Sequence, residues 1–237
     1  PRAAGAVAEP VGMPRPAVFV GRAAEIQQIS AALQKGETAA VCALEGQGGI
    51  GKSALAAYVV DQLRQDRAAL PGGAIWVSAE ELTGAEGMDT LVRRVAFNLG
   101  VDAVAQAPTA AERQAVLARG LLQRPRTLIA VDNLEVGLPV RQIVDLLTLP
   151  GHTALLLTAR QKLDAEIPTQ VELAPLPQTE TELLLRERLH LADPTRPDAT
   201  DVPFMVPLAQ ALEGIPLAVE LTAAYAGQRK RTLASVL

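Results

Sequence analysis

The chain alternates short, wholly apolar runs with longer stretches in which apolar residues recur at helical spacing. Short apolar runs bounded by turn residues are typical of strands that are buried on both faces. These runs predict strands over 38–44, 73–78, 127–132 and 153–158, and a short fifth strand is expected over 170–173. The periodicity between them predicts helices over 23–33, 53–63, 88–99 and 110–122. Strands that alternate with helices predict an α/β fold whose parallel sheet is covered on both faces.

The pattern changes after Pro177, where only helical spacing remains. It predicts helices over 180–191, 207–212 and 217–226, with a proline-containing loop over 193–203. The first sixteen residues carry four prolines and no apolar periodicity, which indicates an extended linker. We therefore expect a linker over 1–16, an α/β domain over 17–175 and a small helical domain over 176–237.

Composition limits the classes of partner. Hydrophobic residues make up 49% of the 237 residues and aromatic residues only 3%, so the core must be built from aliphatic side chains. The net charge is −4, with acidic and basic residues interspersed, which argues against a nucleic-acid partner. We interpret the basic run at 229–231 as the solvated end of a helix rather than a targeting or nucleic-acid patch.

Other features concern the compartment and the source. No apolar run approaches the roughly 18 residues of a membrane span, and no signal peptide opens the chain. Cys42 is the single cysteine, so no internal disulfide can form, which fits a reducing cytoplasm. The chain begins with Pro1 rather than Met, and we expect it to be a piece of a longer protein. Abundant alanine and arginine suggest a bacterial, GC-rich genome.

The strongest chemical signal is a glycine-rich segment that follows the first predicted strand and opens a helix. Residues 46–53 read Gly-Gln-Gly-Gly-Ile-Gly-Lys-Ser, a full match to the P-loop pattern GxxxxGK[ST]. Glycines let backbone N–H groups approach phosphate oxygens, the lysine adds charge beside them, and the serine hydroxyl can ligate Mg²⁺. The expected nucleotide contacts here are Gly46, Gln47, Gly48, Gly49, Ile50, Gly51, Lys52, Ser53 and Ala54.

A second motif completes the expected metal site. The apolar run 128–131 ends in Asp132, which is the Walker B pattern, and its carboxylate would hold Mg²⁺ together with Ser53. The next residue, Asn133, can orient a water but cannot accept its proton. Glu135 is either the missing base or a solvated loop residue. Slow ATP hydrolysis is therefore expected.

The fourth predicted strand ends at Thr158-Ala159-Arg160. If this strand lies between the two motif strands, Arg160 can test for a γ-phosphate, because its guanidinium is a fixed, planar cation. The alternative is a surface arginine at a strand end.

Taken together, these motifs resemble the STAND NTPases, specifically the NB-ARC (AP-ATPase) type of bacterial regulators, plant resistance proteins and apoptotic scaffolds. The resemblance covers about 18–226. Val18 and the residues after it are similar to the family's N-terminal element beside the adenine, which implies adenine contacts at Phe19, Val20, Gly21 and Arg22. The segment 214–218, Gly-Ile-Pro-Leu-Ala, is similar to the family's GxP element, which implies nucleotide contacts at Pro216 and Leu217.

The resemblance implies a fold and a state. The fold is an ASCE/AAA+-like P-loop NTPase with a five-stranded parallel sheet of order 5-1-4-3-2 and a small helical, ARC1-like domain. The implied ligands are ADP or ATP with Mg²⁺. In the intact protein, winged-helix, sensor and effector domains would accompany this core. The chain departs from many relatives at Asp132-Asn133, where those relatives carry two acids, and this departure weakens the expectation of hydrolysis but not of binding.

The leading hypothesis is a signal-transducing switch, closed when ADP is held by the P-loop, Val20 and Pro216, and self-associating when ATP replaces it. The rival is a turnover ATPase of the AAA+ or ORC-like kind that acts on DNA or protein. A small-molecule P-loop kinase is a third hypothesis, in which the GxP-bearing region has no role.

Overall fold

The computed structural model describes residues 10–43, 48–134, 136–228 and 232–237. The predictions for Gly46, Gln47, Glu135 and the basic run at 229–231 lie outside these residues. The described residues divide into two compact units. The α/β unit contains 10–15, 23–43, 52–134 and 136–172, and the helical unit contains 16–22, 48–51, 173–228 and 232–237.

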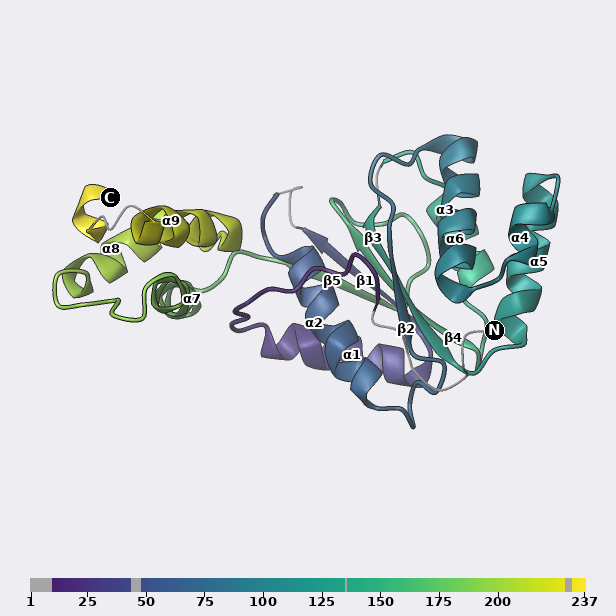
Figure 1. Cartoon of the computed structure of the whole chain (residues 1–237), viewed down its shortest axis with the longest axis horizontal. Helices are drawn as coiled ribbons and strands as arrows, with labels where there is room; N and C mark the ends of the chain where they lie inside the picture. Colours follow the sequence, from purple (N-terminus) through teal and green to yellow (C-terminus); the bar gives the residue numbers. More distant parts are fainter. Residues whose placement is uncertain (1–9, 44–47, 135, 229–231) are drawn as a thin grey trace. The chain divides into compact units, whose positions relative to one another are not determined.

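The α/β unit is built on a five-stranded sheet in the order β2-β3-β4-β1-β5 (Figure 1). The strands are β1 (Thr38–Ala43), β2 (Ala74–Ser78), β3 (Thr127–Leu134), β4 (Thr153–Ala159) and β5 (Thr169–Leu173). The β2–β3, β3–β4 and β1–β4 pairs are parallel. This order is the expected 5-1-4-3-2 counted from the opposite edge, so the predicted fold class is confirmed.

Helices cover both faces of this sheet. On one face lie α1 (Ala23–Lys35) and α2 (Lys52–Gln65), and on the other lie α3 (Gly84–Leu99), α5 (Ala110–Leu122) and α6 (Val140–Leu147), as Figure 1 shows. A short helix, α4 (Ala103–Gln106), precedes α5. Alternate strand residues such as Ile129 and Val131 pack with Leu91, Val95 and Ile143 in one fully buried cluster. Strands that are apolar on both faces are buried on both faces, as their sequence indicates.

The helical unit has its own apolar core. It consists of α7 (Gln178–Ala192), α8 (Val202–Ala211), α9 (Pro216–Gln228) and a 3₁₀ helix, η2 (Leu233–Ser235). The three residues Leu185, Leu189 and Leu233 are fully buried in this core. Val18 and Val20, from the segment before α1, pack against the same core.

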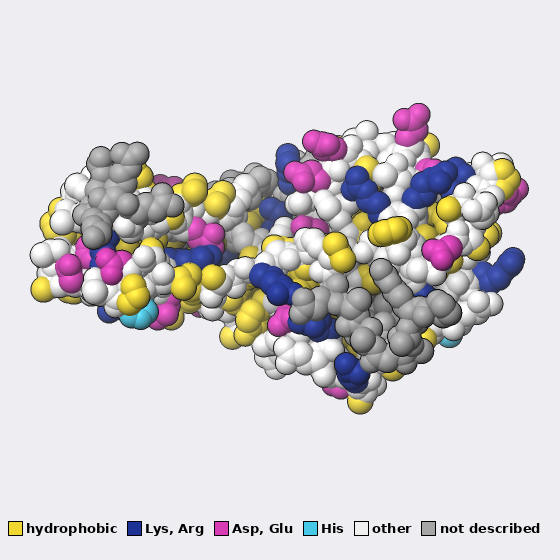
Figure 2. Space-filling model, viewed as in Figure 1, with side chains coloured by type: hydrophobic (Ala, Val, Ile, Leu, Met, Phe, Trp, Pro, Cys, Tyr) yellow, Lys and Arg dark blue, Asp and Glu magenta, His cyan; other side chains and the backbone are white. Residues whose placement is uncertain are grey.

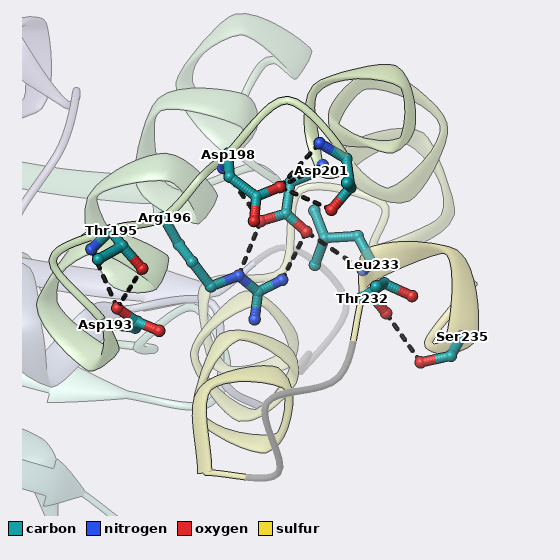
Figure 3. Close-up of polar contacts among 9 residues, drawn as sticks. Asp193, Thr195, Arg196, Asp198, Asp201, Thr232, Leu233 and Ser235 are labelled. Atoms are coloured by element: carbon teal, nitrogen blue, oxygen red, sulfur yellow. Dashed lines mark hydrogen bonds and ion pairs between the residues drawn. The ribbon is translucent and has the colours of Figure 1, made fainter.

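A buried ion pair lies within the loop between α7 and α8, and its aspartate also contacts the end of the helical unit (Figure 3). Arg196 donates to both carboxylate oxygens of Asp201, at 2.7 and 2.6 Å, in the bidentate geometry that guanidinium and carboxylate groups favour. Asp201 Oδ1 also accepts the backbone N–H of Leu233 at 3.3 Å. The side chains of Arg196 and Asp201 are only 7% and 1% exposed, so each depends on the other for its charge to be compensated.

The helical boundaries differ from the prediction at several places. The loop expected over 193–203 ends earlier, because α8 begins at Val202 rather than at 207. Pro203 falls in the first turn of α8, where its missing N–H has no helical partner to lose. Pro207 lies inside the helix and removes one backbone hydrogen bond there. The sequence prediction also omitted α4, α6 and η2.

The described residues include no candidate membrane span, and the face in Figure 2 shows no continuous basic patch. Each helix in the described part of the chain is too short or too polar to cross a bilayer. Figure 2 shows Lys and Arg side chains interspersed with Asp and Glu over the face that it presents.

Candidate functional site

The sheet brings the carboxyl ends of three motif-bearing strands together. In the sheet order, β4 lies between β1 and β3. The P-loop follows β1, Asp132 lies near the end of β3, and Arg160 directly follows β4. Parallel strands present their carboxyl ends at one edge, which is where open α/β sheets bind ligands. The condition set for Arg160 from the sequence, a fourth strand between the two motif strands, is met.

A direct hydrogen bond links the P-loop serine to the Walker B aspartate. Ser53 Oγ donates to Asp132 Oδ1 at 2.7 Å. Ser53 is at the start of α2 and half-buried, whereas Asp132 is 5% exposed. A hydroxyl that donates its proton to the carboxylate keeps its oxygen lone pairs for a cation. The two predicted metal ligands are thus already paired.

Thr158, near the end of β4, makes two further hydrogen bonds at this place. Its Oγ1 donates to Asp132 Oδ1 at 2.5 Å and accepts the backbone N–H of Asn133 at 3.0 Å. The residue is 1% exposed. Sequence reasoning noted Thr158 only as part of a motif and missed this double contact. The available signal was a hydroxyl at the buried carboxyl end of an apolar strand.

The β3 strand is irregular where it passes the aspartate. The β3–β4 register shifts between Val131 and Leu134, and Asn133 has a φ of 58°. Asparagine tolerates this left-handed conformation better than most residues. Asn133 is thus a residue type suited to the backbone conformation that β3 adopts here.

Lys52 lies near enough to both Asp132 and Arg160 for their charges to act on it. The pKa of Lys52 is lowered, first by burial and then by the positive charge of Arg160, while Asp132 acts in the opposite direction. Arg160 itself is exposed at the end of β4. Burial also raises the pKa of the nearby Cys42 thiol, so it stays protonated and packs as an apolar side chain. Because Lys52 and Arg160 repel each other, an anion between them would be stabilised.

In the helical unit, two P-loop glycines lie against the start of α9. The carbonyl oxygen of Gly49 accepts the backbone N–H of Leu217 at 3.2 Å. A Cβ on Gly49 would lie 2.7 Å from the Leu217 Cβ, and Gly49 has a φ of 74°. A Cβ on Gly51 would lie 3.7 Å from Cγ of Pro216, at a φ of 95°. Gly49 therefore cannot carry a side chain without strain.

The remaining predicted contacts before α1 also lie in the helical unit. Phe19 and Val20 are half-buried, and Gly21 and Arg22 have φ values of 72° and 63°. The Arg22 side chain is buried and donates to the carbonyl oxygen of Ala174 at 2.6 Å. The structure thus gives Arg22 a role in holding the chain just after β5, in addition to the adenine contact that the sequence suggests.

The GxP element has a tight backbone environment. Leu176 donates its N–H to the carbonyl oxygen of Gly214 at 2.8 Å. A Cβ on Gly214 would lie 2.3 Å from the Leu176 carbonyl oxygen, and Gly214 has a φ of 69°. Both facts require glycine at this position. Of the other predicted contacts, Gly48 is exposed, Ile50 is buried and Ala54 is half-buried.

The side chains present fit Mg²⁺ that is bound together with phosphate groups. Among the described residues, no group of three or more His, Cys, Asp or Glu side chains could form a metal cage. Mg²⁺ in nucleotide sites takes one or two protein oxygens, with the rest of its ligands from phosphates and water. Ser53 Oγ and Asp132, joined by the 2.7 Å hydrogen bond, supply that oxygen-only pair.

Comparison with known proteins identifies the family and the fold. The model of the NB-ARC domain family matches residues 22–172. The regulatory protein AfsR of Streptomyces coelicolor is 35% identical in a match that covers 61% of this chain and 15% of AfsR. The chain thus matches only about 15% of the length of this curated relative. Among solved structures, Aeropyrum pernix ORC2, in ADPNP–ADP complexes, has a TM-score of 0.66 and 14% identity, over 91% of this chain and 66% of that chain. Drosophila ORC bound to DNA has a TM-score of 0.64 and 15% identity, over 96% and 62%. At these identities the two structures show a shared fold.

Proposed function

The chain belongs to the NB-ARC domain family, and from that premise we propose that it is the ATP- and ADP-binding core of a signal-transducing switch. The observation that carries the proposal is the hydrogen bond from Ser53 Oγ to Asp132 Oδ1. It joins the P-loop serine to the Walker B aspartate, the two residues that we assign to Mg²⁺. The similarity to the regulatory protein AfsR supports a regulatory role.

In this proposal each P-loop residue has a defined task. The backbone N–H groups of Gly48, Gly49 and Gly51 bind phosphate oxygens, because glycine leaves room for a close approach. Burial and then the charge of Arg160 lower the pKa of Lys52, and a bound anion would stabilise the lysine's positive charge. The N-terminus of α2 adds the positive end of the helix dipole.

Mg²⁺, when present, would neutralise phosphate charge and bind Ser53 and Asp132. Asp132 is nearly buried and held by two hydroxyl donors. A carboxylate in this setting offers a fixed negative charge rather than a mobile one. Arg160 is the residue that we assign to the γ-phosphate, since it follows the central strand and lies close enough to influence Lys52.

The switch depends on the difference between ADP and ATP. A ligand shifts a conformational equilibrium only through its differential affinity for the two states. We assign that difference to contacts of the γ-phosphate with Arg160 and Mg²⁺. ADP then maintains a closed resting state of the full-length protein, and ATP favours an open, self-associating state. The Aeropyrum pernix ORC2 structures in ADPNP–ADP and ADP forms show that a protein of this fold accepts both kinds of nucleotide.

Hydrolysis in this proposal is slow. Asn133 cannot accept a proton, and its left-handed backbone is fixed by the Thr158 hydroxyl. A turnover ATPase that works on DNA or protein is the competing function. Steady-state turnover well above about 1 s⁻¹, the low end of ordinary enzyme rates, would favour that competitor.

The test is calorimetric titration of the purified chain with ADP and ATP in the presence of Mg²⁺. We expect Lys52→Ala to abolish measurable binding, because it removes a partly buried cation from the phosphate site. Lys35→Ala removes the same charge from the exposed end of α1 and serves as the matched control. Full affinity in the Lys52→Ala variant would refute the assignment of the phosphate site.

A further inference from the structure

We propose that Thr158 is a positioning residue for Mg²⁺, and that its hydroxyl sets how strongly the metal increases nucleotide affinity. This inference rests on the proposed function and deepens it. Thr158 does not reach the metal itself in this proposal; it acts through the carboxylate of Asp132.

The first argument is the number of donors on one oxygen. Asp132 Oδ1 accepts hydrogen bonds from Ser53 Oγ at 2.7 Å and from Thr158 Oγ1 at 2.5 Å. One donor comes from the start of α2 and the other from β4, so they reach the carboxylate from separate elements. Two fixed donors prevent rotation of the carboxylate about its terminal torsion, which is otherwise a broad one. Loss of the Thr158 donor would leave Ser53 as the remaining side-chain hydroxyl.

The second argument concerns the direction of the Thr158 hydroxyl. A hydroxyl has a single proton. Because the backbone N–H of Asn133 can only donate to Oγ1, at 3.0 Å, the Thr158 proton is directed to Asp132. The backbone N–H of Asn133 thus fixes the direction of the Thr158 hydroxyl. That hydroxyl in turn orients the carboxylate of Asp132.

The third argument concerns burial. Thr158 is 1% exposed and Asp132 is 5% exposed, so water does not readily replace a lost hydroxyl donor. Residues that orient a metal ligand by a hydrogen bond, without contacting the metal, typically change metal affinity by about tenfold to a hundredfold. A threonine at the buried end of a central strand is suited to this task, because its β-branched side chain has few rotamers.

A purely structural alternative makes a different prediction. In that alternative, Thr158 serves only to hold Asn133 at its φ of 58°. Glycine adopts that conformation without cost, so Asn133→Gly should then correct any defect of Thr158→Val. If Thr158 instead positions Asp132, the defect persists in the double variant.

The experiment measures ADP affinity with excess Mg²⁺ and with EDTA, and takes the ratio as the gain from Mg²⁺. We expect Thr158→Val to reduce this ratio by about tenfold or more, with the affinity in EDTA changed less than about twofold. Thr158→Ser, which keeps the hydroxyl, should restore the wild-type ratio. Thermal unfolding of the nucleotide-free variants shows whether they fold, and Thr158→Ala replaces the valine variant if that one does not.

Two contrary outcomes are distinguishable. An unchanged ratio in the hydroxyl-free variant, or its correction by Asn133→Gly, would overturn the role of Thr158 while leaving nucleotide binding intact. A wild-type chain that binds no ADP, or gains nothing from Mg²⁺, would overturn the proposed function and this inference together.

Discussion

Ser53 Oγ and Asp132 Oδ1 are joined by a 2.7 Å hydrogen bond, although the two residues are 79 positions apart in the sequence. The bond can form because only β4 lies between β1 and β3 in the sheet. The carboxyl ends of β1 and β3, which carry the two motifs, therefore lie close together. Preorganisation of this kind means that a metal ligand pair need not be assembled at the moment of binding.

Asp132→Asn should reduce the gain in ADP affinity from Mg²⁺ by about tenfold or more. The amide retains an oxygen that can accept from Ser53 and Thr158, but it removes the negative charge that a hard cation needs. Titration with and without EDTA measures the effect. Asp145→Asn makes the same change on the exposed surface of α6 and should leave the gain unchanged. Equal gains in both variants would contradict the metal assignment.

Local sequence patterns were sufficient for much of the fold. The apolar runs located four of the five strands, β1 to β4, because strands buried on both faces have a continuous apolar pattern. The fifth, β5, is an edge strand in which apolar and polar residues alternate. The α6 helix was missed although its signal is present, with apolar residues at 140, 143, 144 and 147. The start of α8 was missed because proline was taken as a break, whereas it fits a first helical turn.

The sequence was sufficient to predict the motifs of the candidate site, but not the hydrogen bonds between them. Lys52, Ser53 and Asp132 are defined by spacing and type, which a sequence displays directly. The bond between Thr158 and Asp132 joins residues 26 positions apart and depends on strand register, which no local pattern fixes. The left-handed Asn133 likewise arises from the irregular β3–β4 pairing.

Gly49→Ala should destabilise the nucleotide-free chain. Its left-handed φ alone costs an L-residue about 1–2 kcal/mol, and the new Cβ would press on Leu217. Gly48→Ala is the matched control in the same loop, because a Cβ there meets nothing within 4 Å, and its effect should stay within about 0.5 kcal/mol. Denaturant unfolding followed by circular dichroism measures both. Similar stabilities for the two variants would argue against the described packing of Gly49 on α9.

Breaking the buried Arg196–Asp201 pair from one side should be costly. Asp201→Asn leaves a buried guanidinium without its counter-charge, and we expect a loss of about 3–5 kcal/mol. Replacing both partners, as in Arg196→Met with Asp201→Leu, should destabilise the chain less than Asp201→Asn does, because no uncompensated charge remains. The free energies of unfolding of the three proteins provide the comparison. If the double variant is less stable than Asp201→Asn, an uncompensated buried charge is not the main cause of the lost stability.

The same pair predicts a dependence of stability on pH. Hydrogen bonds from Arg196 lower the pKa of Asp201 in the folded state, so the folded state binds fewer protons than the unfolded one. Its contribution is complete above the unfolded carboxyl pKa of about 3.9 and is lost as pH falls through the lower folded pKa. Arg196→Met with Asp201→Leu should lose less stability between about pH 4 and pH 2 than the wild type, as measured by denaturant midpoints. Parallel curves would refute this linkage.

The central claim, that this chain holds an adenine nucleotide at its P-loop, is tested most directly by the nucleotide that the purified protein releases on acid treatment. Chromatography should show ADP close to one equivalent per chain in the wild type and essentially none in Lys52→Ala. Such a result means that ADP dissociates slowly enough to survive purification, as a closed resting state requires. If the wild type is empty, added ADP at about one hundred times its Kd should still stabilise it by about 2.7 kcal/mol. A protein that is purified without nucleotide, and that neither ADP nor ATP stabilises, would contradict the claim that the P-loop binds an adenine nucleotide.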